Sequence, residues 1–119
     1  MRSTLPQSSN RAAAVLSRRK LLPAVVLLLH LSAIHAKAET LQVTIEKMAF
    51  SPVSIDAKIG DTIEWVNKDF LVHTATVKEG WEVMIPAGKS ASLVLTSVGT
   101  VQYYCRLHPN MKASLTVKP

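Results

Sequence analysis

After residue 39, apolar and polar side chains alternate with a period of two, which is the pattern of strands with one buried face. The clearest example is residues 41–46, where Leu41, Val43 and Ile45 form the apolar side. The same pattern covers residues 53–59, 62–67, 90–95, 101–105 and 115–117, and more weakly 74–77. Because no stretch after residue 38 keeps an apolar period of 3.6 residues, we predict an all-β fold, a sandwich or a barrel of seven to eight short strands.

The first 38 residues have a different pattern. Residues 1–20 are polar and basic, residues 21–34 form an apolar stretch, and Ala36-Lys37-Ala38 then matches an A-x-A cleavage site. This order is typical of a secretory signal peptide, and the apolar stretch is shorter than the about 20 residues of a membrane helix. We therefore predict a signal peptide at 1–38 and a single domain at 39–119. An uncleaved membrane anchor is the alternative.

The basic part of this segment contains the pair Arg18-Arg19, followed by Lys20, Leu21 and Leu22. It resembles the twin-arginine export signal, and the alternative is an ordinary secretory signal that happens to contain two arginines. Either route carries the domain out of the cytoplasm, so we expect it in a bacterial periplasm, with no membrane span after cleavage.

Charge separates the two parts of the chain. Lys and Arg number 14 against 8 Asp and Glu, but six of the basic residues and none of the acidic ones precede residue 39. Residues 39–119 therefore have a formal net charge of zero. A neutral domain lacks the field that drives binding to a phosphate backbone, so nucleic acid is not an expected partner. The domain is also short for most enzyme scaffolds, which favours binding or electron transfer over catalysis.

The domain has few Cys, His and Met side chains that could bind a transition metal, and three of them are close together in sequence. Cys105, His108 and Met111 form a C-x2-H-x2-M motif, and His73 is the only other histidine after residue 38. Two imidazoles, a thiolate and a thioether are the donors of a trigonal copper site with a weak axial methionine. Each residue alone has an ordinary alternative as a buried cysteine, a surface histidine or a core methionine. Their coincidence favours one metal site, with zinc as the alternative metal.

Two longer blocks of sequence surround these donors. Residues 50–52 and 60–67 precede His73, and residues 99–111 contain the other three donors. Both blocks resemble the cupredoxins, most closely the amicyanin-type, plastocyanin-like branch, because only two residues separate the second histidine from the methionine. The resemblance covers nearly the whole of 39–119.

The resemblance implies a Greek-key β-sandwich and one type 1 copper ion that carries single electrons. The family's ligand roles fall on His73, Cys105, His108 and Met111. One departure is Val72-His73-Thr74, where the amicyanin pattern has Pro-His-Asn. We expect Asn67 either to tie the His73 loop to the Cys105 loop or to serve as a simple turn residue.

In this family the second histidine presents its edge to solvent within an apolar patch. The candidates for that patch are Leu71, Val72, Met84, Leu107 and Pro109. The basic residues expected around it, which would orient an acidic partner, are Lys68, Arg106 and Lys112.

The sequence therefore predicts a monomeric electron shuttle that is not an enzyme. Its redox partners would be proteins such as a dehydrogenase donor and a cytochrome c or oxidase acceptor. The alternative is a copper chaperone or copper buffer, whose sites are typically open and rich in Met or His clusters. Met48 and Met84 are isolated in sequence, and a multicopper oxidase is excluded because its His-x-His pairs are missing.

Overall fold

The computed structural model describes residues 2–5, 20, 23–30, 32 and 37–119. The chain divides into two units, Met1–Ala33 and Ile34–Pro119. The described residues before Thr40 form neither helix nor strand, and no described residue belongs to a helix long and apolar enough to span a membrane. The predicted signal peptide at 1–38, including Arg18 and Arg19, lies largely outside the described residues and stays a prediction.

The described strands all belong to the second unit. In chain order they are β1 (Thr40–Glu46), β2 (Ala49–Ser51), β3 (Ser54–Lys58), β4 (Thr62–Asn67), β5 (His73–Thr76), β6 (Glu82–Ile85), β7 (Ser90–Val94), β8 (Gly99–Cys105) and β9 (His108–Lys118). The short strands β2 and β6 were not predicted from the sequence. Strand β9 is longer than the alternation at 115–117 suggested, because it begins at His108.

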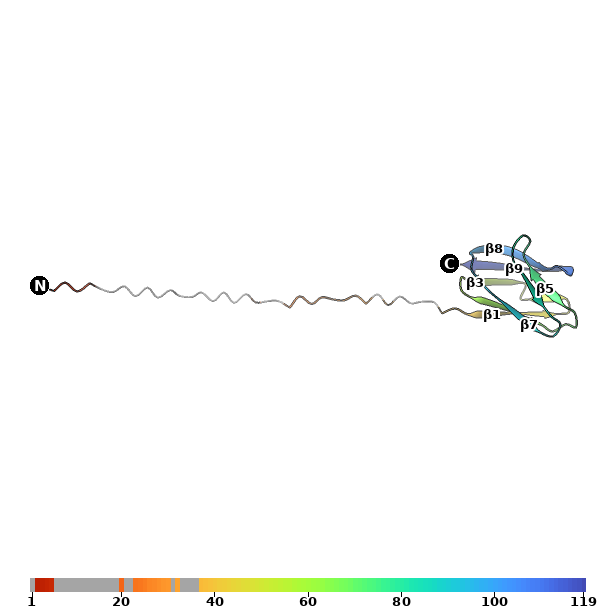
Figure 1. Cartoon of the computed structure of the whole chain (residues 1–119), viewed down its shortest axis with the longest axis horizontal. Coiled ribbons are helices and arrows are strands. Elements are labelled where there is room, and N and C mark those ends of the chain that lie inside the picture. The colour runs from red at the N-terminus through yellow and green to blue at the C-terminus, as the bar shows by residue number, and fades with distance from the viewer. Residues whose placement is uncertain (1, 6–19, 21–22, 31, 33–36) are drawn as a thin grey trace. The chain divides into compact units, whose positions relative to one another are not determined.

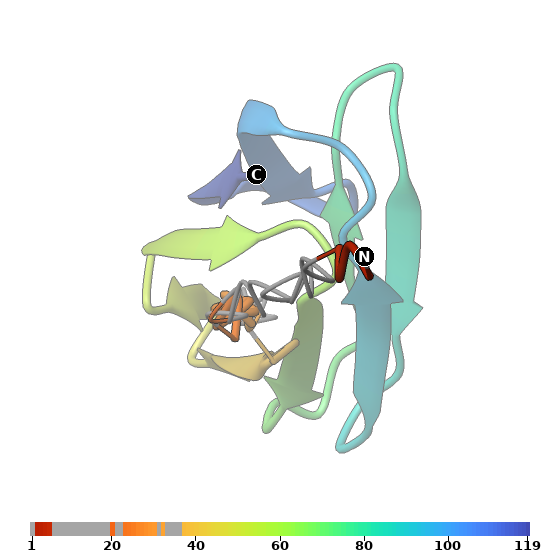
Figure 2. The same ribbon diagram turned by 90° about the vertical axis from the view of Figure 1, so that its left-hand side faces the viewer.

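The strands form two sheets that face each other (Figure 1). One sheet has the order β2-β1-β4-β7 and the other the order β3-β9-β8-β5-β6. Each sheet contains one parallel pair, β1 with β4 and β3 with β9, and its other pairs are antiparallel. Figure 2 shows the same sheets after a rotation of 90°. The predicted all-β sandwich is confirmed.

The buried faces of the strands meet in one aromatic core. Tyr103 on β8 packs edge-on against Phe50 of β2 and Trp65 of β4, with ring centroids 4.9 and 5.8 Å apart. Burying side chains of this size stabilises the fold by about 1.5–3 kcal/mol each. Because side chains two residues apart share a strand face, Cys105 is buried on the same face as Tyr103. The end of β8, which carries Cys105, is thus packed against the aromatic core.

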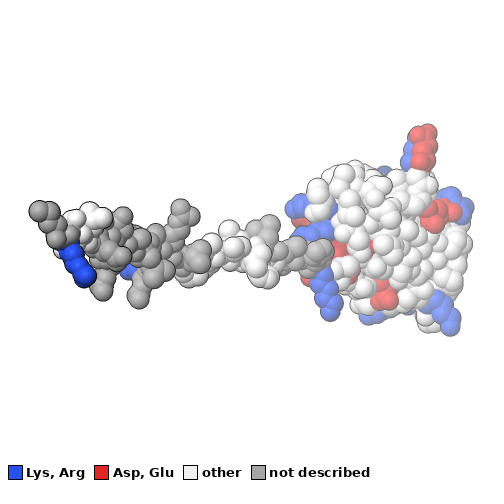
Figure 3. All heavy atoms as spheres, turned by 60° about the vertical axis from the view of Figure 1, so that its left-hand side comes forward, with Lys and Arg blue, Asp and Glu red and all other residues white. Residues whose placement is uncertain are grey.

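Acidic and basic side chains are mixed on the face of the domain that Figure 3 shows, without an extended patch of one sign. This distribution agrees with the zero net charge of residues 39–119.

Candidate metal centre

Three of the four predicted donors lie at the ends of neighbouring strands of the five-stranded sheet. His73 begins β5, Cys105 ends β8 and His108 begins β9. Cys105 and His108 are opposite each other in the β8–β9 register, joined by a turn at Arg106 and Leu107. Pro109 lies within β9, where the register with β8 shifts between Tyr104 and Cys105.

The donor atoms of these three residues converge on one point. His73 Nδ1 is 3.1 Å from His108 Nδ1, and Cys105 Sγ lies 3.8 Å from the first nitrogen and 3.4 Å from the second. Metal–nitrogen bonds of about 2.0–2.1 Å and metal–sulfur bonds of about 2.3 Å place two donors on one metal roughly 3.3–3.8 Å apart. The observed separations are close to that range. The arrangement fits one type 1 copper ion, whose preferred donors are imidazole and thiolate.

Met111 lies three residues after His108 on β9 and is buried, with 4% of its surface exposed. Together with His108, Met48, Pro109 and Asn110 it lines a surface pocket. The structure therefore places Met111 near His108. Its role as the weak axial ligand stays a prediction.

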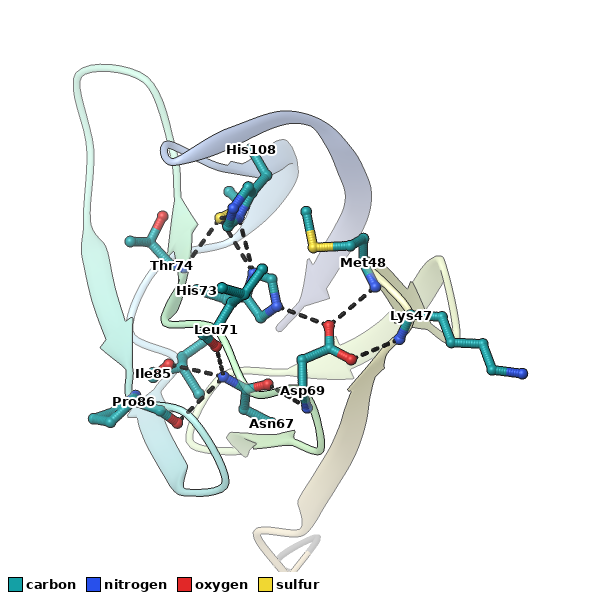
Figure 4. Close-up of polar contacts among 11 residues, drawn as sticks. Lys47, Met48, Asn67, Asp69, Leu71, His73, Thr74, Ile85, Pro86 and His108 are labelled. Atoms are coloured by element: carbon teal, nitrogen blue, oxygen red, sulfur yellow. Dashed lines mark hydrogen bonds and ion pairs between the residues drawn. The ribbon is translucent and has the colours of Figure 1, made fainter.

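A carboxylate that the sequence analysis missed fixes the orientation of His73. Asp69 Oδ2 accepts a hydrogen bond from His73 Nε2 at 2.8 Å (Figure 4). Because an ionised carboxylate only accepts hydrogen bonds, Nε2 carries the imidazole proton. Nδ1 is then left with a free lone pair, which faces Cys105 and His108. The position of an acid four residues before the first ligand was the available signal in the sequence.

Asp69 also holds the two-residue turn between β1 and β2. Lys47 and Met48 both have positive φ angles, 52° and 62°, a conformation that non-glycine residues rarely adopt. Their backbone N–H groups donate to the Asp69 carboxylate at 2.7 and 3.0 Å. Desolvation raises the pKa of Asp69, but the hydrogen bonds from Met48, His73 and Lys47 together outweigh it and hold the pKa below its ordinary value. The carboxylate therefore joins the turn to His73 in its ionised form.

Burial differs between the donors. His73 and Cys105 are fully buried, whereas His108 is partly exposed. The backbone N–H of Thr74 donates to Cys105 Sγ at 3.3 Å, so the sulfur already has one hydrogen-bond donor from the protein. Within the donor cluster His73, Cys105 and His108, it is therefore His108 that has exposed surface.

Asn67 does not tie the His73 loop to the Cys105 loop. Its side-chain nitrogen donates to the backbone oxygens of Leu71, Ile85 and Pro86, at 2.8, 3.1 and 3.2 Å (Figure 4). Its side-chain oxygen accepts from Asp69 N at 2.9 Å. Asn67 is thus more than a turn residue, but it connects the loop before His73 to the segment after β6. This placement follows from β6, a strand that the sequence did not predict.

Apolar side chains are exposed on segments next to β5, β8 and β9, the strands that carry the donors, and at the β1–β2 turn. The expected candidates Leu71, Met84 and Leu107 are 51%, 49% and 43% exposed. Phe70, which the sequence analysis did not include, is 99% exposed, and Met48 is 39% exposed. Arg106 is exposed but paired with Glu82, whose Oε1 accepts from Arg106 Nε at 2.7 Å. Of the three predicted basic residues, Lys68 and Lys112 make no ion pair with another described residue.

Comparison with known proteins gives consistent matches. The family model of the cupredoxin-like domain matches residues 20–117. Amicyanin-alpha of Methylorubrum extorquens is 30% identical over 90 residues, which cover 70% of this chain and 76% of that protein. Amicyanin of Paracoccus denitrificans is 29% identical over 83 residues, covering 64% of this chain and 63%, less than two thirds, of that protein.

Solved structures agree with these sequence matches. A methionine-to-alanine variant of amicyanin in its Cu(I) form is similar with a TM-score of 0.61 and 27% identity, over 66% of this chain and 82% of that one. The resemblance inferred from the sequence blocks on either side of His73 is confirmed.

Asp69→Asn should destabilise the metal-free protein by about 1–3 kcal/mol at neutral pH, because one amide oxygen cannot accept all three N–H groups. The loss should shrink as pH falls through the lowered pKa of Asp69, since the carboxylate's contribution is complete only above the ordinary value of 3.8. Denaturant unfolding from neutral to acid pH measures the loss of stability and its dependence on pH. The control is Glu64→Gln, an acid whose side-chain partner is Gln42. Equal stability of Asp69→Asn and the control at neutral pH would contradict this role.

Proposed function

Because the chain belongs to the family of cupredoxin-like domains, we propose that residues 39–119 form a blue copper protein that carries single electrons. The proposed ligands of its type 1 copper are His73, Cys105, His108 and Met111. The observation that carries this proposal is the convergence of two imidazole nitrogens and one thiol sulfur within 4.8 Å of one another.

Copper would supply the one-electron couple between Cu(I) and Cu(II), and the protein's residues prepare its site. Asp69 keeps the proton of His73 on Nε2, away from the metal position. The N–H of Thr74 holds Cys105 Sγ. Since the donors already lie at metal-like separations, little rearrangement accompanies binding or a change of charge. A site that rearranges little suits fast electron exchange.

The exposure pattern favours electron exchange through His108. His108 is partly exposed, while His73 and Cys105 are fully buried. The exposed side chains of Leu71 and Leu107 supply apolar surface on the adjoining loops. The proposed partners are redox proteins, such as a dehydrogenase as donor and a cytochrome c or an oxidase as acceptor, which meet a monomer of this domain.

The copper chaperone or buffer is less well supported. Handing a metal to another protein requires donors that the recipient can approach. In this domain two of the proposed ligands, His73 and Cys105, have no exposed surface. Burial of this kind favours keeping the metal while electrons pass.

Copper-loaded protein should show the intense blue absorption of thiolate-to-Cu(II) charge transfer. Cys105→Ser should abolish it, because a hydroxyl is a poor soft ligand. Met84→Leu is the matched control, since Met84 is a half-exposed residue of β6 and should leave the colour unchanged. Absorption spectroscopy during a Cu(II) titration is the measurement. A colourless Cu(II) complex of the wild type would refute the proposed function.

We further propose that residues 1–38 are removed on export to the periplasm. The mature protein should then begin at or near Glu39, which N-terminal sequencing of the periplasmic fraction tests. Lysine in place of both Arg18 and Arg19 should block export only if the twin-arginine route is used. Full-length protein found in the membrane fraction would contradict the cleavage.

A further inference from the structure

Four residues outside the donor set form a closed circuit of hydrogen bonds beside Cys105. The backbone N–H of Arg106 donates to Thr74 Oγ1 at 2.8 Å. Thr74 Oγ1 and Thr76 Oγ1 are 2.8 Å apart, and Thr76 Oγ1 donates to Glu82 Oε1 at 2.8 Å. Arg106 Nε donates to the same Glu82 oxygen at 2.7 Å. The circuit therefore starts and ends at Arg106, and we call these four residues the hydroxyl ring.

The protons of the hydroxyl ring have one consistent arrangement. A threonine hydroxyl has a single proton, and Thr76 gives its proton to Glu82. The bond between the two hydroxyls must then be donated by Thr74, whose oxygen accepts from Arg106 N–H. Each hydroxyl thus donates once and accepts once. Such a chain strengthens its members cooperatively, and losing any link leaves a neighbour unsatisfied.

Backbone pairing between β5 and β8 is short beside the hydroxyl ring. Strand β5 pairs with β8 through a single register position, Thr76 opposite Tyr104. By contrast, β8 and β9 pair in one register from Gly99 to Tyr104, and this register shifts between Tyr104 and Cys105. Thr74 is fully buried and Thr76 nearly so, so water cannot replace their partners. The hydroxyl ring therefore fastens the end of β8 to β5 and β6.

Thr74 links the ring directly to the sulfur. Its backbone N–H donates to Cys105 Sγ, while its hydroxyl accepts from the backbone N–H of Arg106, the residue after Cys105. Figure 4 shows Thr74 beside His73 on β5, with its contact toward the donor cluster. Thr74 therefore contacts both the sulfur of Cys105 and the backbone N–H of Arg106. Any loosening of the ring should therefore lengthen the N–H···S hydrogen bond.

We propose that Thr74, Thr76 and Glu82 are positioning residues that act through Arg106. They keep Cys105 Sγ within hydrogen-bond distance of the backbone N–H of Thr74. The effect of this positioning on copper rests on the proposed function. Hydrogen bonding to the cysteine sulfur tunes the reduction potential of such sites. A weaker bond leaves more charge on the thiolate, which favours Cu(II), so breaking the hydroxyl ring should lower the potential.

The first test uses metal-free protein and measures amide hydrogen exchange. Thr74→Val and Thr76→Val each keep the side-chain shape and charge but remove one hydroxyl. Both should speed exchange of the Thr74 and Arg106 amides about tenfold, the effect of losing one hydrogen bond of ordinary strength. Thr74→Ser and Thr76→Ser should restore the wild-type rate. The matched control is Thr100→Val, which breaks an exposed threonine pair with Thr116 on β8 and β9.

Glu82→Ala covers the case in which the buried variants fail to fold, because the Glu82 side chain is 35% exposed and its loss leaves the core intact. It should speed exchange of the same two amides. Unchanged exchange in Thr76→Val or Glu82→Ala would overturn the proposal. Serine variants that behave like the valine variants would also overturn it, since shape rather than the hydroxyl would then matter.

The second test measures the reduction potential of copper-loaded protein. Thr74→Val and Thr76→Val should lower it, while Thr74→Ser and Thr100→Val should leave it unchanged. An unchanged potential in both valine variants would overturn the effect on copper. A wild type that forms no blue Cu(II) complex would instead refute the proposed function, and the exchange test would still decide whether the hydroxyl ring holds the Cys105 loop.

Discussion

The arrangement of the site depends on the hydrogen bond between His73 Nε2 and Asp69. A neutral imidazole has one proton, and this bond assigns it to the nitrogen that faces away from the other donors. The same carboxylate binds the turn at Lys47 and Met48, whose positive φ angles would otherwise be unfavourable. One ionised side chain therefore stabilises a strained turn of the four-stranded sheet and orients a donor on the five-stranded sheet. Loss of the Asp69 carboxylate should therefore destabilise the turn and free the orientation of His73.

Three donors lie where strands end because the sandwich brings those ends together. In the five-stranded sheet, the antiparallel pairs β5–β8 and β8–β9 place the start of β5 beside the end of β8 and the start of β9. The aromatic ring of Tyr103 packs in the core two residues before Cys105, and Cys105 itself is fully buried. Hydrogen bonds, rather than a continuous backbone ladder, then fasten β5 to β8. Thr74 of the hydroxyl ring thus contacts Cys105, while Asp69 contacts His73.

The fold class and the donor residues could be predicted because both depend on local patterns. Alternation along β1, β4 and β8 follows directly from one buried face, and the C-x2-H-x2-M motif keeps its donors close by covalent connection alone. Strand β6, the contact of Asp69 with the β1–β2 turn and the role of Glu82 could not be predicted, because they depend on contacts between segments far apart in sequence. The contact of Asp69 with Met48 joins residues 21 positions apart, and that of Arg106 with Glu82 joins residues 24 apart. Asn67 was recognised as important, but its partners follow from β6.

Nitrogen NMR of the His73 imidazole tests the central claim most directly, in the metal-free protein and after loading with Cu(I). The structure predicts a protonated Nε2, with a slowly exchanging N–H signal, and an unprotonated Nδ1 in both forms. Asp69→Asn should weaken that preference, whereas Glu64→Gln should not. A proton on Nδ1 in the metal-free protein, or rapid exchange between the two nitrogens, would contradict the account.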